Sequence, residues 1–498
     1  MKGLHLFIVS SLACCFGAVA SGQAQVQHEV FLANTDHELH VYRVLGEAPG
    51  KTLMIIGGIQ GDEPGGYMTA DLYADIHLKT GNLIVVPRAN FYSILLNRRD
   101  GQTGDMNRKF TAEEEARRSL EEEVVTVLKR LIAESDCLLN LHEGSGVYSP
   151  TWVSDMENPL RFGQSVIFDA QDFVVPETGG AVLHLGEIAG KVVEHVNQQL
   201  EDVEYRFKAN NHDTLSPDSL HKEQRTSATY YALTVAHIPA FGVETSKMIK
   251  TLATKISLQK LVINAMMHEL GIEFDEPGVN IPEPELRYLL VKVNGGYPLA
   301  LPQGAVLEVA EGDDVVVTDI IANYQRGLVA DVEGFGTTND TNRPFRVTDA
   351  TRVIVRKDSE QCGWVELIPQ RKRAGESRVA SDKARLSLAE LQAEELLIDV
   401  NGAMATLPVR QTLTVDKGTR LTLQSIRSNI ARCDNTIVVN FKGFAPPKSV
   451  NDGNDLLFPI YTDQDLWARY SIDQQGRRYP IVATYNDKVI GEFFVELR

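Results

Sequence analysis

Apolar and polar positions follow two different patterns along this chain, and the change between them falls close to residue 276. From residue 27 to about residue 274, short apolar runs of strand length alternate with longer runs that have the spacing of amphipathic helices. From residue 286 onward the apolar runs are short, rich in β-branched residues and separated by Gly and Asn. The pattern therefore predicts an α/β part, a proline-marked linker and an all-β part.

Buried strands are predicted in the first part at residues 52–56, 83–86 and 137–141. Between them, the apolar spacing predicts helices at residues 65–78 and 111–133. Thr111 has the character of an N-cap for the second helix, and the acids that follow it suit a helix N-terminus. Strands that alternate with helices indicate a layered fold with a mostly parallel sheet, where sites form at the carboxyl ends of strands.

The second part contains an internal repeat. The segment LLVKVNG at residues 289–295 is matched by LLIDVNG at residues 396–402, and each copy continues with a glycine, an alternating run and a Gly-Phe pair. Repeats of about one hundred residues with period-two alternation indicate two tandem β-sandwich modules, at residues 285–370 and 391–498. Chance similarity between two all-β segments is the alternative. Residues 371–390 are expected to be a solvated linker, although their basic cluster could contact an anionic wall polymer.

Length and charge narrow the possibilities further. A chain of 498 residues is too long for one hydrophobic core, so several domains are expected. The formal net charge of −18 argues against nucleic acid and against an anionic membrane surface as partners, because both attract basic patches. Apart from the N-terminal segment, no stretch approaches the ~20 apolar residues that a membrane span needs.

The N-terminus has the features of a secretory signal peptide. Lys2 precedes an apolar run that ends in the small-residue sequence AVA at residues 18–20. We therefore expect residues 1–20 to be removed on export and the first domain to cover residues 21–276. A buried N-terminal helix is the alternative, and Cys14 or Cys15 could carry a lipid, although neither lies in a good lipobox.

Three cysteines follow the signal segment. Cys137 lies in an apolar run and is expected to be a small buried hydrophobic residue. Cys362 and Cys433 could bridge two domains, but their spacing does not decide this. No cysteine spacing fits a metal cluster, so any metal ligands must come from other residue types.

Candidate metal ligands come directly after two of the predicted strands. Gln60 and Glu63 stand three apart on a glycine-rich turn that follows residues 52–56, and such a pair can point toward one ion. His142 follows residues 137–141 and enters a second glycine-rich segment. A Gln–Glu pair alone is weak evidence, and a lone His is more often a satisfied core residue. The three together favour a metal site.

Two further segments carry charged and polar groups suited to peptide chemistry. The loop at residues 97–108 holds Arg98, Arg99, Asn107 and Arg108, and arginine forks with an amide donor can hold a substrate carboxylate. Glu244 ends an apolar run and could be a general base. The bland alternatives are a surface loop with incidental charge and an ordinary acid at the end of a strand.

Together these segments resemble the M14-type metallocarboxypeptidases. The strings GIQGDEPGG at residues 58–66 and GDMNRKF at residues 104–110 are similar to the branch of murein D,L-carboxypeptidases that determine helical cell shape, an M99-like branch. The resemblance covers essentially the whole mature chain. It implies an α/β zinc-carboxypeptidase-like domain with a mixed, mostly parallel sheet, followed by two small all-β domains of the sandwich or Ig-like kind.

The resemblance also implies roles for individual residues. Gln60, Glu63 and His142 match the zinc ligands, with Gln60 standing where most M14 enzymes have histidine. Asn107 and Arg108 match the pair that binds the terminal carboxylate of the substrate, and Glu244 matches the catalytic base. Arg99 matches the arginine that polarises the scissile carbonyl. Because the following loop is one residue longer than the family pattern, Arg98 is the alternative.

The function implied is a periplasmic, zinc-dependent enzyme that removes meso-diaminopimelate from muramyl tripeptides and leaves dipeptides. The β modules could contact the cell wall or another protein. One alternative is a different hydrolase on the same scaffold, of the aspartoacylase or succinylglutamate desuccinylase kind. A second is a murein-peptide-binding protein that has lost catalysis, in which Gln60 in place of histidine would reflect a degraded active site.

Overall fold

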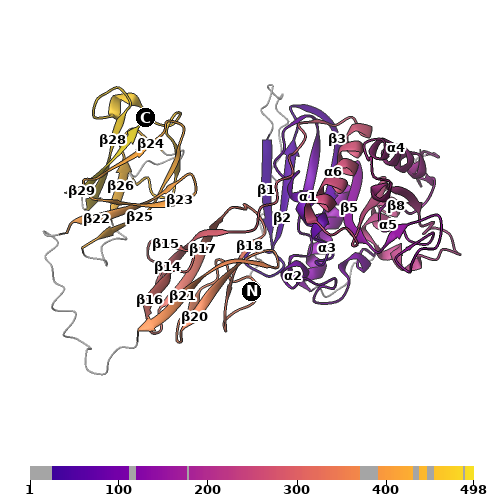
Figure 1. The fold of residues 1–498 in the computed structure, drawn as a ribbon, viewed down its shortest axis with the longest axis horizontal. Helices are drawn as coiled ribbons and strands as arrows, with labels where there is room; N and C mark the ends of the chain where they lie inside the picture. The colour runs from indigo at the N-terminus through magenta and orange to yellow at the C-terminus, as the bar shows by residue number, and fades with distance from the viewer. Residues whose placement is uncertain are drawn as a thin grey trace, which may run out of the picture.

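The computed structural model describes residues 25–111, 119–176, 179–370, 391–429, 437–445, 454–485 and 488–498. Figure 1 shows an α/β body that contains the N-terminal half, a β-sandwich beside its strands β1 and β2, and a second β-sandwich farther away. We call residues 286–370 the first β module and residues 393–497 the second β module. The predicted signal peptide at residues 1–20 and the predicted linker at residues 371–390 lie outside the described residues.

A nine-stranded mixed sheet forms the centre of the α/β body, in the order β1-β2-β4-β3-β5-β12-β8-β11, with β13 paired to β4. Pairing is parallel through the centre, from β4 to β12, and antiparallel toward β1, which confirms the predicted α/β class. Its strands are β1 (Gln25–Phe31), β2 (Leu39–Leu45), β3 (Ala48–Ile56), β4 (Leu78–Val86), β5 (Cys137–Gly144), β8 (Ser165–Phe168), β11 (Lys208–Asn211), β12 (Ala240–Ser246) and β13 (Glu273–Phe274). Short pairs form from β6 (Val147–Tyr148) with β7 (Glu157–Asn158) and from β9 (Phe173–Val174) with β10 (Val182–Leu183).

Helices cover both faces of this sheet (Figure 1). They are α1 (Pro64–Asp71), α2 (Phe91–Leu95), α3 (Leu120–Ala133), α4 (Leu185–Asn197), α5 (Ala228–Thr234) and α6 (Leu252–Glu269), with 3-10 turns η1 (Met106–Arg108), η2 (Val203–Tyr205) and η3 (Lys222–Thr226). One buried core joins α4 and α6 to the sheet, and a second joins α3 and α5 to its opposite face. The result is a three-layer α/β/α body.

Two helix predictions need correction. Helix α1 ends at Asp71 rather than continuing to residue 78, and residues 72–75 form turns before β4 begins at Leu78. The N-cap of α3 is Ser119 and not Thr111: the Ser119 side chain accepts from the backbone N–H of Glu122, whose carboxylate accepts from the backbone N–H of Ser119. This reciprocal capping box satisfies two free N–H groups, which Thr111 cannot do from eight residues away.

The two β modules have the same topology, which confirms the sequence repeat. Their sheets run β15-β14-β17-β19 and β16-β21-β20-β18 in the first, and β23-β22-β25-β27 and β24-β29-β28-β26 in the second. Each module has its own buried apolar core between its two sheets. The strands are β14 (Leu286–Val293), β15 (Leu299–Pro302), β16 (Val306–Ala310), β17 (Asp314–Ala322), β18 (Leu328–Val332), β19 (Phe345–Arg346), β20 (Thr351–Lys357), β21 (Glu360–Gln370), β22 (Ala393–Val400), β23 (Ala403–Pro408), β24 (Thr412–Val415), β25 (Arg420–Ser428), β26 (Val438–Phe441), β27 (Pro459–Tyr461), β28 (Arg478–Tyr485) and β29 (Lys488–Leu497), with the 3-10 turn η6 (Ala468–Tyr470).

Cys137 is buried in the core, as predicted, and burial raises the pKa of its thiol to about 12. Cys362 forms no disulfide with another described residue, and Cys433 lies outside the described residues, so the suggested pairing stays untested. Among the described residues, no helix is both long enough and apolar enough to cross a membrane.

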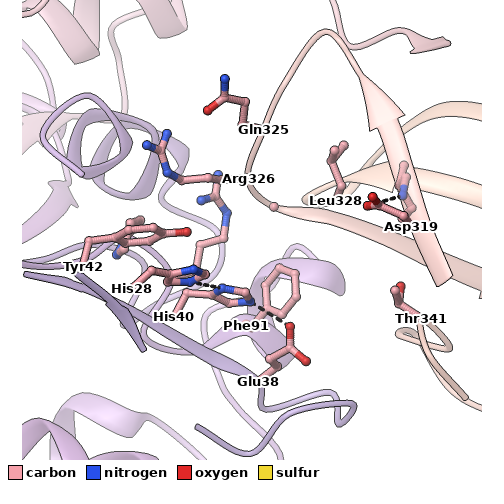
Figure 2. A pocket seen from close by; sticks show the side chains of 14 residues that line it. His28, Glu38, His40, Tyr42, Phe91, Asp319, Gln325, Arg326, Leu328 and Thr341 are labelled. Carbon is pink, nitrogen blue, oxygen red and sulfur yellow. Dashed lines mark hydrogen bonds and ion pairs between the residues drawn. The ribbon is translucent and has the colours of Figure 1, made fainter. Parts of the chain in front are cut away.

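The first β module packs against the edge of the α/β body that carries β1 and β2. A cleft of about 760 Å³ lies in this interface (Figure 2). Tyr42 and the pair His28 and His40 line it on the α/β side, and Arg326 enters it from the module. The Arg326 guanidinium lies 5.1 Å from the centre of the Tyr42 ring and 2.6 Å from Asp75, so this cleft is bridged by charged contacts.

Candidate active site

The turn that follows β3 places Gln60 and Glu63 at the carboxyl end of the parallel sheet. Gly61 has no room for a side chain, because a Cβ there would lie 2.2 Å from the backbone of Ser93. Gly58 has a φ of +65°, a conformation that glycine adopts without strain. The turn therefore depends on its glycines, and it ends at Glu63, the residue that precedes helix α1.

The Gln60 side chain is held in one orientation by Asp105. Its Nε2 donates to both carboxylate oxygens of Asp105, at 3.1 and 3.0 Å. A carboxylate only accepts hydrogen bonds, so the NH₂ group of Gln60 must face Asp105 and the amide oxygen must face away from it. Burial raises the pKa of Asp105. The hydrogen bond from Gln60 and the charges of Arg99 and Arg108 together lower this pKa by more, so the net shift is downward.

Glu63 and His142 meet in the same buried place, although 79 residues separate them. His142 lies near the end of β5, and its Nδ1 is 2.9 Å from Oε2 of Glu63. The backbone N–H of Glu143 donates to the same oxygen at 3.1 Å. Burial lowers the pKa of His142, but the hydrogen bond and the negative charge of Glu63 outweigh it, so the net shift is upward.

Glu244 faces this pair from the neighbouring strand. In the parallel pairing of β12 with β5, Glu244 stands directly opposite His142, so the two side chains lie on the same side of the sheet. Its Oε2 atom is buried and has no hydrogen-bond partner in the described part of the chain. Burial raises the pKa of Glu244 to about 7; the charge of Glu63 raises it as well, while His142 and Arg99 oppose the rise.

These donors fit a divalent metal ion. Gln60, Glu63 and His142 offer an amide oxygen, a carboxylate and an imidazole nitrogen, which are oxygen and nitrogen ligands of borderline metals. Among the described residues, no group of three or more His, Cys, Asp or Glu side chains could hold a metal. The Gln60 amide is not one of these four side-chain types. The partnerless oxygen of Glu244 lines the same cleft, as expected for a group that acts on a ligand.

The structure separates the two arginines that the sequence left as alternatives. Arg99 enters the cleft, with Nη2 at 3.1 Å from Asp105 and Nη1 at 3.6 Å from Glu63. Arg98 turns the other way: it donates to the backbone carbonyl of Asp100 and lies over the ring of Tyr92. Arg98 is therefore the one predicted site residue that does not line the described cleft.

Asn107 and Arg108 lie on the 3-10 turn η1, beside His142. The Asn107 side-chain oxygen accepts from the backbone N–H of Ala228 at 3.0 Å, and its Nδ2 is 3.5 Å from His142 Nε2. Arg108 donates to the carbonyl of Asn107 at 2.9 Å and also lines the cleft. Asp105 begins this turn by accepting from the backbone N–H of Asn107, so one carboxylate positions both η1 and Gln60.

The cleft that these residues share has a volume of about 780 Å³. Three other lining residues were not predicted from the sequence. Lys247 follows β12 and pairs with Asp62 at 2.7 Å. Asn140 lies two residues before His142 on β5, and both polar atoms of its buried side chain lack a partner. His212 also lines the cleft, and burial lowers its pKa to about 4. The alternation of β5 could have indicated Asn140, because residues i and i+2 share a face.

Comparison with known families identifies the family of this chain. The family model described as a carboxypeptidase controlling helical cell shape, catalytic part, matches residues 32–284, just over half of the chain. This chain belongs to that family. It is therefore a carboxypeptidase, and the two alternatives, a hydrolase of the acyl-amino-acid kind and a binding protein without catalysis, are not supported. No curated protein matches the chain.

Similar solved structures agree with the fold. The tripeptide-bound cell shape determinant Csd4 from Helicobacter pylori is 21% identical, with a TM-score of 0.51 over 92% of this chain and 100% of that chain. Csd4 bound to mDAP, described as a D,L-carboxypeptidase, is 22% identical, with a TM-score of 0.50 over 90% of this chain and 97% of that chain. At these identities the likeness shows that the α/β body and both β modules share one fold with Csd4.

Proposed function

We propose that this carboxypeptidase is a zinc-dependent D,L-carboxypeptidase that removes terminal meso-diaminopimelate from murein tripeptides and leaves dipeptides. We place it in the periplasm after removal of residues 1–20, with a catalytic domain at residues 21–276 and β modules at residues 285–370 and 391–498 that contact the wall or another protein. The observation that carries the proposal is the convergence of Gln60, Glu63, His142 and Glu244 on one cleft that also holds Asn107 and Arg108.

Gln60, Glu63 and His142 are the residues that would hold zinc in this proposal. Zinc at such a site polarises a carbonyl and lowers the pKa of a bound water to about 7. One carboxylate and two neutral donors give the same charge balance as a His–Glu–His site. Asp105 contributes by keeping the Gln60 amide nitrogen occupied, so that its oxygen is the atom presented as a ligand.

The remaining residues bind the substrate and move protons. The Arg108 fork and the Asn107 amide group are suited to the terminal carboxylate of the peptide, because both offer directed N–H donors. Arg99 is suited to the scissile carbonyl, since its guanidinium lies beside Glu63 and is half exposed to the cleft. Glu244 takes a proton from the attacking water at its partnerless Oε2 and returns it to the leaving amine.

Product analysis tests this proposal. Zinc-loaded protein is incubated with muramyl tripeptide, and the products are separated and weighed by mass spectrometry. We expect a dipeptide and free diaminopimelate from the wild type. Glu244→Gln keeps the shape of the side chain and removes its base, so we expect turnover to fall ~10²–10⁴-fold. An intact tripeptide after incubation with the wild type, or a variant as active as the wild type, would contradict the proposal.

A further inference from the structure

Two cations and two carboxylates meet where helix α1 packs against the first β module. Arg88 donates to both oxygens of Asp71 at 2.7 Å and, from its other side, to both oxygens of Asp358. Lys357 contacts Asp358 and lies 3.2 Å from the sulfur of Met68. The two cations and Asp358 are buried, and Asp71 is nearly so. Charges removed from water cost several kcal/mol each unless good geometry offsets it.

The β module is shaped for this contact. Gly327 has a φ of +71°, and a Cβ there would lie 2.4 Å from Oδ1 of Asp358 and 2.5 Å from Nε of Arg88. Only a glycine leaves room for the pair. Beside the ions, Val329 and Tyr324 of the module pack in one apolar cluster with residues of α1 and α2. The cluster comprises Tyr67, Met68, Phe91, Ile94, Leu95, Ile256 and Val329, with Leu72, Leu252, Val279, Ile281 and Tyr324 packed against it.

Arg88 is connected to the Gln60–Glu63 turn through its neighbours in the chain and through helix α1. Its backbone neighbours hold the start of the turn: the N–H of Ala89 donates to the carbonyl of Gly57, and the N–H of Asn90 to that of Gly58, both at 2.9 Å. Its guanidinium pairs with Asp71, the last residue of α1, which is the end of that helix away from Glu63. Arg88 thus links the segment that holds the start of the turn to the helix that follows the turn.

We propose that Asp358 of the first β module is a positioning residue for the Gln60–Glu63 turn and acts through Arg88. The inference rests on the proposed metal-dependent function. It makes the first β module a structural part of the catalytic unit, and not only a tethered binding module. Without the Asp358 carboxylate, Arg88 keeps the Asp71 carboxylate as its partner, whereas Lys357 loses the carboxylate that it contacts. Displacements of about 1 Å at distant supports can cost ~10²-fold in rate, so a small shift of α1 is enough to matter.

Substitution of Asp358 tests this. We compare Asp358→Asn with the wild type by zinc affinity from chelator competition, by kcat and KM on the tripeptide, and by hydrogen exchange of residues 57–71. We expect zinc affinity and kcat to fall at least tenfold, KM to change less than threefold, and exchange of residues 57–71 to accelerate. A double variant, Lys357→Met with Asp358→Asn, removes one cation together with one anion, so the remaining charges of Arg88 and Asp71 still balance. This variant also lacks the Asp358 carboxylate, and it can be measured if Asp358→Asn alone does not fold.

Asp36→Asn is the matched control. Asp36 accepts hydrogen bonds from the Thr337 side chain at 2.8 Å and the Asn339 backbone at 3.0 Å, so it also joins the α/β body to the module but does not touch Arg88. We expect this variant to stay within twofold of the wild type. Equal losses in Asp36→Asn and Asp358→Asn, or a folded Asp358 variant with unchanged zinc affinity and exchange, would overturn the proposal. An inactive wild type would instead sink the proposed function, while zinc affinity and exchange still test the positioning role.

Discussion

Asp105→Asn tests the proposed metal site without changing a proposed ligand, because Asp105 lies behind Gln60. The carboxylate accepts two hydrogen bonds from Gln60 Nε2, one from Arg99 and one from the backbone N–H of Asn107. Asparagine keeps the size but offers one oxygen and one NH₂ group. When its NH₂ group faces Gln60, the Gln60 amide must turn over, and its nitrogen then points where its oxygen pointed.

Partners behind metal ligands are typically worth ~10–100-fold in metal affinity. We therefore expect Asp105→Asn to raise the zinc dissociation constant ~10–100-fold, which corresponds to about 1.4–2.8 kcal/mol at 1.4 kcal/mol per tenfold. Competition with a chromophoric chelator measures this constant directly. The loss should be smaller for activity at saturating zinc, because excess metal refills the site by mass action.

Asp100→Asn is the control, since it makes the same charge change in the same loop and Asp100 has no side-chain contact with Gln60 among the described interactions. Its zinc affinity should match that of the wild type. If Asp105→Asn retains zinc as tightly as the wild type does, the orientation of the Gln60 amide by Asp105 has no bearing on metal binding, and the reasoning is refuted.

Three further predictions concern other residues of the cleft. Gln60→His should bind zinc more tightly than the wild type in chelator competition, because imidazole is a better donor than an amide oxygen; equal or weaker binding would sink this idea. Arg108→Lys should raise KM about tenfold with kcat largely retained in steady-state assays, since a point charge replaces a two-pronged fork; an unchanged KM would show that Arg108 does not bind the carboxylate. Burial and the neighbouring His221 lower the pKa of His212 to about 4 in the folded protein, against about 6.5 in the unfolded chain. Between these two pH values only the unfolded state gains a proton at His212. The free energy of unfolding therefore falls as the pH drops through this window. His212→Gln should remove roughly 1–3 kcal/mol of that fall between pH 7 and pH 4.5, measured by urea unfolding; an identical pH dependence in the variant would disprove it.

The sequence was sufficient for features whose signals are local. Glycines on either side of Gln60 require a turn at this point, and the apolar runs before Gln60 and His142 place both residues at the carboxyl end of parallel strands. The sequence repeat predicted the two β modules, and both modules have the same strand order. Each of these predictions depends on contacts between residues that are close in the sequence.

Features that depend on distant contacts were not predictable. Arg98 and Arg99 are adjacent and chemically alike, and only the contact of Arg99 with Asp105 and Glu63 distinguishes them. Asp105 itself lies in a polar loop where an acid gives no special signal. The pairing of Arg88 with Asp358 spans 270 residues and joins the α/β body to the first β module, so no local sequence pattern predicts it. Such contacts arise from the docking of whole elements.

The central claim is a metal-dependent enzyme that acts on one murein peptide length. The most direct measurement incubates the purified protein with muramyl tri-, tetra- and pentapeptides, each with and without a chelator, and follows free diaminopimelate. We expect release from the tripeptide alone, abolished by the chelator and restored by zinc. No release from any of the three peptides, or release that the chelator leaves unchanged, would contradict this account.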